Sequence, residues 1–125
     1  MKTAQDFLEE ANKTVPRMSA EDAIAKYKQG GGVFIDVRDS GDIAKSGTIK
    51  GATRIARGFM EFAADENLEQ FHKPVLKKDA DIYLICGAGG QAALAGKTLQ
   101  EMGFKNVTNI GGIGDWKDAG GDMED

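Results

Sequence analysis

Two helices are predicted near the amino-terminal end from the helical spacing of apolar positions. In residues 3–13 this spacing places Phe7, Leu8 and Ala11 on one side, and Pro16 ends the helix because proline removes a backbone donor. The pattern therefore indicates a short amphipathic helix before the main body of the chain.

The second helix has clear start and stop signals. Ser19 is a suitable N-cap, with Asp22 three residues later in the capping-box position. The apolar face of this helix consists of Ala23, Ile24 and Tyr27. The glycines at 30–32 end it, as glycine commonly does at a helix C-terminus.

Short, nearly continuous apolar runs follow at 33–37 and 82–86. Both have the length of a parallel strand that is buried on its two faces. Shorter extended pieces are expected at 52–55 and 107–110, and the spacing at 91–102 predicts another helix, which Gly103 caps.

Alternating strands and helices predict an α/β domain with a mainly parallel sheet. We divide the chain into a helical extension (1–18), one domain (19–120) and a frayed tail (121–125). The segment at 63–81 is long for a loop and is either a functional flap or contains a short helix. The extension is expected to pack on the domain, with a homodimer contact as the alternative to a monomer.

Composition narrows the function. The 125 residues are 41% hydrophobic and 29% charged, with a net charge of −4 and no basic stripe, which argues against nucleic-acid binding. No apolar run approaches the length of a membrane span, and Asp6, Glu9 and Glu10 interrupt any signal-peptide core. The expectation is a cytoplasmic protein with no membrane association.

Cys86 is the only cysteine, and there is one histidine. An internal disulfide and a cysteine metal cluster are therefore excluded, and a zinc site is not expected. No cofactor is predicted.

The position of Cys86 suggests chemistry. It ends the most hydrophobic predicted strand and precedes Gly87, Ala88, Gly89, Gly90 and Gln91, after which a helix begins. Backbone N–H groups of such a turn and the helix N-terminus favour an anion, here the thiolate, which could attack sulfur and hold it as a persulfide. The alternatives are a cysteine that only packs and a turn without a ligand. A phosphate-binding P-loop is excluded because no Gly-Lys-Ser/Thr follows.

Four segments in order resemble the rhodanese family of sulfurtransferases. They are the strand at 33–38 ending in Asp36-Val37-Arg38, the Gly-Thr-Ile-Lys-Gly-Ala stretch at 47–52, the strand and loop at 82–92, and the stretch at 107–116 with Gly111, Gly112 and Trp116. Residues 57–62 and 72–74 are similar to the Arg-Gly-x-x-Glu-Phe and His-x-Pro segments of one bacterial single-domain subgroup.

The resemblance implies a three-layer α/β sandwich around a five-stranded sheet, and transfer of sulfane sulfur from a donor such as thiosulfate or a persulfide. Cys86 would be the nucleophile, and residues 87–91 would bind the substrate. Arg57 and Glu61 would lie near the mouth of the site. Asp36, Arg38, Gly111, Gly112 and Trp116 would be structural.

The chain departs from the family pattern inside the loop. Gly87 and Gln91 stand where the family usually has arginines, Ala92 replaces a hydroxyl residue, and Thr48 replaces the usual histidine. Thiosulfate is then a poor substrate unless a cation outside the loop (Arg54, Arg57 or Lys73) reaches in. Related phosphatases need an arginine at position 92, so phosphatase activity is rejected.

Two functions remain open. One is an active sulfurtransferase, whose acceptor must be an external thiol or protein because no second cysteine is present. The other is a low-activity or non-catalytic module that carries sulfur or docks a protein, which the absence of loop arginines favours. A hydrolase using Cys86 and His72 is a third interpretation, for which nothing places the two side chains together.

Overall fold

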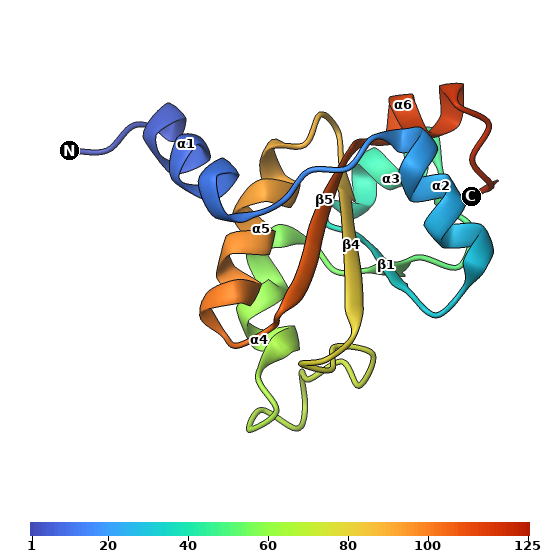
Figure 1. Ribbon diagram of the computed structural model, residues 1–125. Helices are drawn as coiled ribbons and strands as arrows, with labels where there is room; N and C mark the ends of the chain where they lie inside the picture. Colours follow the sequence, from blue (N-terminus) through green and yellow to red (C-terminus); the bar gives the residue numbers. More distant parts are fainter.

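The computed structural model describes all residues 1–125 and is built around a parallel sheet (Figure 1). Its strands are β1 (Val33–Asp36), β3 (Thr53–Arg54), β4 (Asp81–Cys86) and β5 (Asn106–Gly112), in the spatial order β3-β1-β4-β5. Every pair is parallel. The predicted α/β class is confirmed, with four strands in the main sheet rather than five.

The register of the two central pairs determines what surrounds the thiol. Along β1 and β4, Val33 pairs with Ile82 and Asp36 pairs with Ile85. Between β4 and β5 the register shifts after Leu84, so that Cys86 lies opposite Gly112. Cys86 therefore lies at the carboxyl edge of a central strand, beside a residue without a side chain.

Helices cover both faces of the sheet, which explains why its central strands β1 and β4 are mostly apolar. On one face, α4 (Met60–Ala64) and α5 (Gly90–Glu101) enclose a cluster that includes Leu84 and Cys86. On the other face, α2 (Ala20–Gln29) and α6 (Ile113–Asp118) enclose a second cluster. Figure 1 shows these two layers on opposite sides of β4 and β5.

The predicted elements match the structure within one or two residues at most ends. Ser19 caps α2, its Oγ accepting a hydrogen bond from the N–H of Asp22, and Gly30 ends that helix. A further helix, α3 (Ser40–Ser46), follows β1 in the chain. No helix is long and apolar enough to cross a membrane.

The amino-terminal helix α1 (Ala4–Thr14) packs against α5. Gln100 Nε2 on α5 donates to the Thr14 carbonyl at 2.8 Å. Val15 fills the space beside Gly96, since a Cβ at that glycine would lie 2.8 Å from Val15 Cγ1. The extension is therefore seated on the domain, and the chain continues from it directly toward the carboxyl edge of the sheet.

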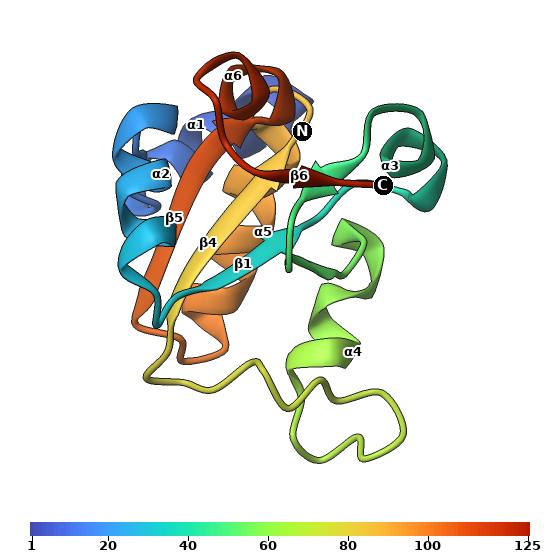
Figure 2. The same cartoon turned by 90° about the vertical axis from the view of Figure 1, so that its right-hand side faces the viewer.

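The carboxyl-terminal tail is ordered, so the expectation of a frayed end is wrong. β6 (Met123–Glu124) pairs antiparallel with β2 (Thr48–Ile49), as Figure 2 shows. Trp116 Nε1 donates to the Asp122 carbonyl at 3.0 Å. The tail passes directly over the Trp116 ring because Gly121 has no side chain to hold it away. The Gly- and Asp-rich composition of the tail suggested fraying, but contacts with residues outside the tail hold it against the domain.

The long segment after α4 contains neither helix nor strand between residues 65 and 80, only consecutive turns. Leu76, which is 1% exposed, anchors it in the core, and the N–H of Lys73 donates to the Ala63 carbonyl. The segment leads into the first residue of β4. It therefore lies at the opposite end of β4 from Cys86, the last residue of that strand. Figure 1 shows the segment as the loops below β4.

Candidate active site

The side chain of Cys86 points into the turn that follows β4 and receives two backbone hydrogen bonds. The N–H of Gly89 donates to Sγ at 2.9 Å, and the N–H of Ala92 donates at 3.4 Å. Gly89 belongs to the loop, as the N-cap of α5, and Ala92 belongs to the first turn of that helix. The sulfur is thus placed where amide dipoles and a helix N-terminus stabilise negative charge.

The thiol is nearly closed off from solvent. Cys86 is 1% exposed and takes part in the apolar cluster under α5, whereas Gly87, Ala88 and Gln91 are exposed above it. Apolar side chains therefore surround the thiol on the side of the core, and backbone N–H groups of the loop cover it on the side of the solvent. This glycine-rich turn therefore separates Sγ from solvent.

Glycine is required at two places in the loop. Gly89, the N-cap of α5, has φ +102°, a backbone conformation that L-residues with side chains rarely adopt. Gly112 on β5 lies so close to the Gly87 carbonyl that a Cβ there would collide with it. These two requirements fix the path of the loop over the sulfur.

The structure brings two residues to the loop that sequence reasoning missed, Asn109 and Arg17. Asn109 is 1% exposed; its Nδ2 donates to the Gly89 carbonyl at 2.9 Å, and its Oδ1 accepts from the N–H of Gly111 at 2.8 Å. Arg17 Nη2 lies 3.4 Å from the Ala88 carbonyl. The amide of Asn109 within the predicted strand at 107–110 was an available signal, because buried polar groups need partners.

The other cations named from the sequence do not contact the loop. Arg57 Nη2 donates to Thr98 Oγ1 at 3.1 Å, and its Nη1 pairs with Glu61 at 3.1 Å. Thr98 lies two turns beyond Gly90 along α5, about 12 Å at the usual helical rise. Arg54 binds the Asp125 carbonyl at 2.8 Å. Lys73 belongs to the turn segment at the far edge of the sheet.

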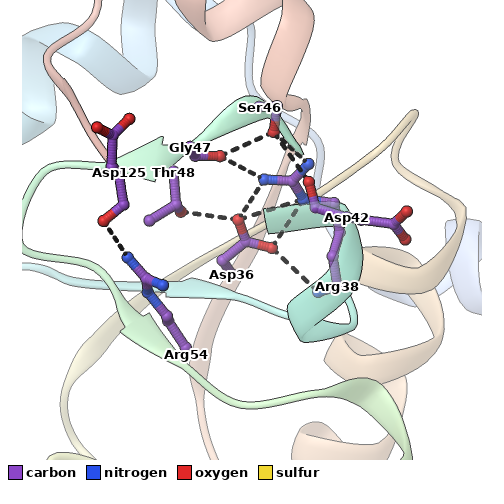
Figure 3. Close-up of polar contacts among 8 residues, drawn as sticks. All are labelled: Asp36, Arg38, Asp42, Ser46, Gly47, Thr48, Arg54 and Asp125. Atoms are coloured by element: carbon purple, nitrogen blue, oxygen red, sulfur yellow. Dashed lines mark hydrogen bonds and ion pairs between the residues drawn. The ribbon is translucent and has the colours of Figure 1, made fainter. Parts of the chain in front are cut away.

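A buried ion pair stabilises the neighbouring strand end (Figure 3). Arg38 Nη2 lies 2.8 Å from Asp36 Oδ2, with side-chain exposures of 6% and 0%. Arg38 also donates to Ser46 Oγ and to the Gly47 carbonyl, and Thr48 Oγ1 donates to Asp36 Oδ2 at 2.7 Å. Thr48 thus belongs to the polar network around this carboxylate.

The remaining residues singled out from the sequence lie away from the sulfur or at the rim of the loop. Trp116 is 1% exposed and packs in the second cluster, and Gly111 adopts a positive φ of +87° beside Arg17. His72 lies in the turn segment that precedes β4, so the structure does not join it to Cys86. No group of three or more His, Cys, Asp or Glu side chains is arranged to hold a metal ion.

A cysteine at the carboxyl edge of a parallel sheet, under a glycine-rich loop that opens a helix, defines a class of α/β domains. A family model for the rhodanese-like domain matches residues 19–119. The chain belongs to the rhodanese-like domain family.

Two solved structures share the fold of the chain. A Rhodopseudomonas palustris protein of unknown function, RPA3614, described as a possible tyrosine phosphatase, has a TM-score of 0.91 and 37% identity, covering 99% of this chain and 96% of that one. The polysulfide-sulfur transferase homodimer of Wolinella succinogenes has a TM-score of 0.73 and 28% identity, covering 94% and 84%.

Among curated proteins, YrkF of Bacillus subtilis, which is named as a sulfur carrier, is 32% identical over 84 residues. This match covers 66% of the chain and 40% of YrkF, so the chain corresponds to less than half of that relative.

Proposed function

We propose that this chain is a sulfurtransferase that carries sulfane sulfur on Cys86 as a persulfide. The observation that carries the proposal is the pair of N–H groups, from Gly89 and Ala92, that donate to Sγ. Family membership and the relatives named as a sulfur carrier and a polysulfide-sulfur transferase support the same chemistry.

The proposed reaction has two displacements at sulfur. The Cys86 thiolate attacks the sulfane sulfur of the donor, forming one S–S bond while the bond to the donor's leaving group breaks. Sulfite leaves with the electron pair if the donor is thiosulfate, and a thiolate leaves if it is a persulfide. An acceptor thiolate then attacks the outer sulfur and releases Cys86 as thiolate, so no external oxidant or reductant is needed.

The charge of the loop favours persulfide donors over thiosulfate. Gln91 is exposed and brings no charge where the family usually has arginine. A charge-assisted hydrogen bond is worth about 1.5–3 kcal/mol, so its absence weakens binding of a divalent anion by roughly ten- to a hundredfold. We therefore propose a small persulfide as donor and an external thiol or protein thiol as acceptor.

A phosphatase activity, which the description of RPA3614 raises, is disfavoured by the same loop. Position 92 is alanine, 0% exposed, and contributes only its backbone N–H. A phosphoryl group would meet no guanidinium within the loop.

Multiple-turnover transfer distinguishes an enzyme from a passive carrier. The reduced protein is incubated with a persulfide donor and an excess of thiol acceptor, and transferred sulfur is counted per mole of protein. We expect many turnovers for the wild type and background for Cys86→Ser. One equivalent or less from the wild type would favour the passive carrier, and none would reject the proposal.

A further inference from the structure

The guanidinium of Arg17 is seated on the outer side of the loop that covers Cys86. Its Nη2 lies 3.4 Å from the Ala88 carbonyl oxygen. A Cβ built on Gly89 would lie 2.6 Å from Nη1, and one on Gly111 would lie 3.2 Å from Nη2. The guanidinium therefore occupies space that the absence of side chains at both glycines leaves open.

The backbone of Arg17 is fixed to β5 rather than free. Arg17 forms a parallel bridge with Asn109: the N–H of Asn109 donates to the Pro16 carbonyl, and the N–H of Met18 donates to the Asn109 carbonyl, both at 2.9 Å. The side chains of this bridged pair act on successive loop carbonyls. Arg17 binds that of Ala88, and Asn109 binds that of Gly89.

The peptide unit between Ala88 and Gly89 links Arg17 to the thiol. Its carbonyl faces Arg17, and its N–H donates to Cys86 Sγ at 2.9 Å. Because a trans peptide is planar, holding the oxygen outward directs the N–H inward. A cation at the oxygen also polarises the unit and strengthens its N–H as a donor, as in any chain of hydrogen bonds.

We propose that Arg17 is a positioning residue for Cys86, which holds and polarises the Ala88–Gly89 peptide so that its N–H stabilises negative charge on Sγ. The inference rests on the proposed function, in which that charge is the attacking thiolate. Arg17 thereby supplies, from a segment before the domain's first helix, a positive charge that the loop lacks.

The charge of Arg17 is not cancelled by a partner, because no carboxylate oxygen lies within 4 Å of it. The loop's own helix has no acidic residue in its first turn. Charged groups on the elements packed around the loop are mostly paired with each other: Asp36 with Arg38, Arg57 with Glu61, and Lys97 with Glu101. Asp115 lies in the first turn of α6.

The test is a titration of the thiolate by its ultraviolet absorbance, which needs no reagent to reach the buried sulfur. Cys86 is the only cysteine, so a Cys86→Ala protein supplies the blank. Ionisation of the tyrosines is separated from the pH range of the thiol titration, because burial raises the pKa of both Tyr27 and Tyr83 above the usual value. Thermal melting of each variant reports folding.

We expect the midpoint to rise by roughly half a pH unit in Arg17→Ala, the size typical of one exposed charge near a titrating group. The midpoint of the thiolate titration should also rise in Arg17→Gln, which keeps a donor without the charge. It should rise less in Arg17→Lys, which keeps the charge. Lys105→Ala is the matched control, since this exposed cation precedes β5 at the opposite edge of the sheet. It should leave the midpoint unchanged.

A midpoint in Arg17→Ala and Arg17→Gln equal to that of the wild type would overturn the inference. If Arg17→Ala does not fold, Arg17→Gln decides the matter alone. Sulfur loading of the wild type is measured separately. A raised midpoint in the variants together with no sulfur gain in the wild type would sustain the role of Arg17 and reject the proposed function.

Discussion

The backbone N–H of Gly89 lies 2.9 Å from Cys86 Sγ and donates to it. This contact exists because Gly89 adopts a left-handed backbone conformation, with φ +102°, at the start of α5. One residue thus begins a helix, turns the chain over the sulfur and supplies the closest donor to it.

Gly89→Ala should disturb all three roles. An L-residue at this φ costs about 1–3 kcal/mol, and its Cβ would meet the Arg17 guanidinium. We expect a loss of unfolding free energy of that size, measured by urea denaturation, and sulfur loading of Cys86 slowed about tenfold or more because the N–H moves off the thiolate.

Gly51→Ala is the control for backbone strain. Gly51 also has a positive φ, +84°, but lies in a turn with no atom within 4 Å of its Cβ position. It should lose comparable stability and keep normal loading. Equal loading rates in the two variants would contradict a special role for Gly89.

Asn109→Ala should destabilise the domain through the loop. The substitution leaves the buried Gly111 N–H without its partner, which costs about 1–3 kcal/mol, and removes one of the two hydrogen bonds to the Gly89 carbonyl, which keeps the one from the Ala93 N–H. Urea denaturation measures this loss. Asn106→Ala provides the comparison, because the Asn106 side chain is exposed and makes one long contact of 3.5 Å. A similar small loss in both variants would show that the loop does not depend on Asn109.

Thr48→Val tests whether the threonine that replaces histidine supports the buried ion pair. It removes the 2.7 Å hydrogen bond to Asp36 Oδ2 while keeping the shape of the side chain. We expect a loss of about 1.5–3 kcal/mol, because the acceptor is charged and buried. Thr53→Val, at a partly exposed strand position with no side-chain hydrogen bond, should change stability little. If the two variants unfold at the same urea concentration, the contact contributes nothing.

Much of the fold could be predicted from local patterns. The apolar runs identified β1 and β4, and glycine after Cys86 identified the turn and the start of α5. These features depend on residues that are neighbours in the sequence, so the periodicity of apolar residues and the positions of turn-forming residues predict them.

What the sequence did not reveal depends on long-range pairing. Arg17 reaches the loop only because its segment bridges with Asn109 on β5, and nothing near Arg17 in the sequence indicates this. The same holds for β6, whose pairing with β2 orders a tail of flexible composition. The sequence therefore pointed to Arg54, Arg57 and Lys73 and did not identify Arg17, the cation that contacts the loop.

Gln91→Arg should raise activity with thiosulfate. Gln91 is exposed on the first turn of α5 and makes no side-chain hydrogen bond, so arginine fits without displacing a contact. A restored charge-assisted bond predicts roughly a ten- to hundredfold gain in kcat/KM for thiosulfate, with a smaller gain for an uncharged donor. Gln70→Arg, in the exposed turn segment, adds the same charge away from the thiol. A gain equal in both variants would mean that net charge, not the loop, limits the reaction.

The most direct measurement of the central claim is the intact mass of the reduced protein after exposure to a persulfide donor and, separately, to thiosulfate. We predict that the wild type gains the mass of one sulfur atom from the persulfide donor, that peptide analysis places it on Cys86, and that Cys86→Ala gains none. A wild type that gains no sulfur from either donor would contradict the account.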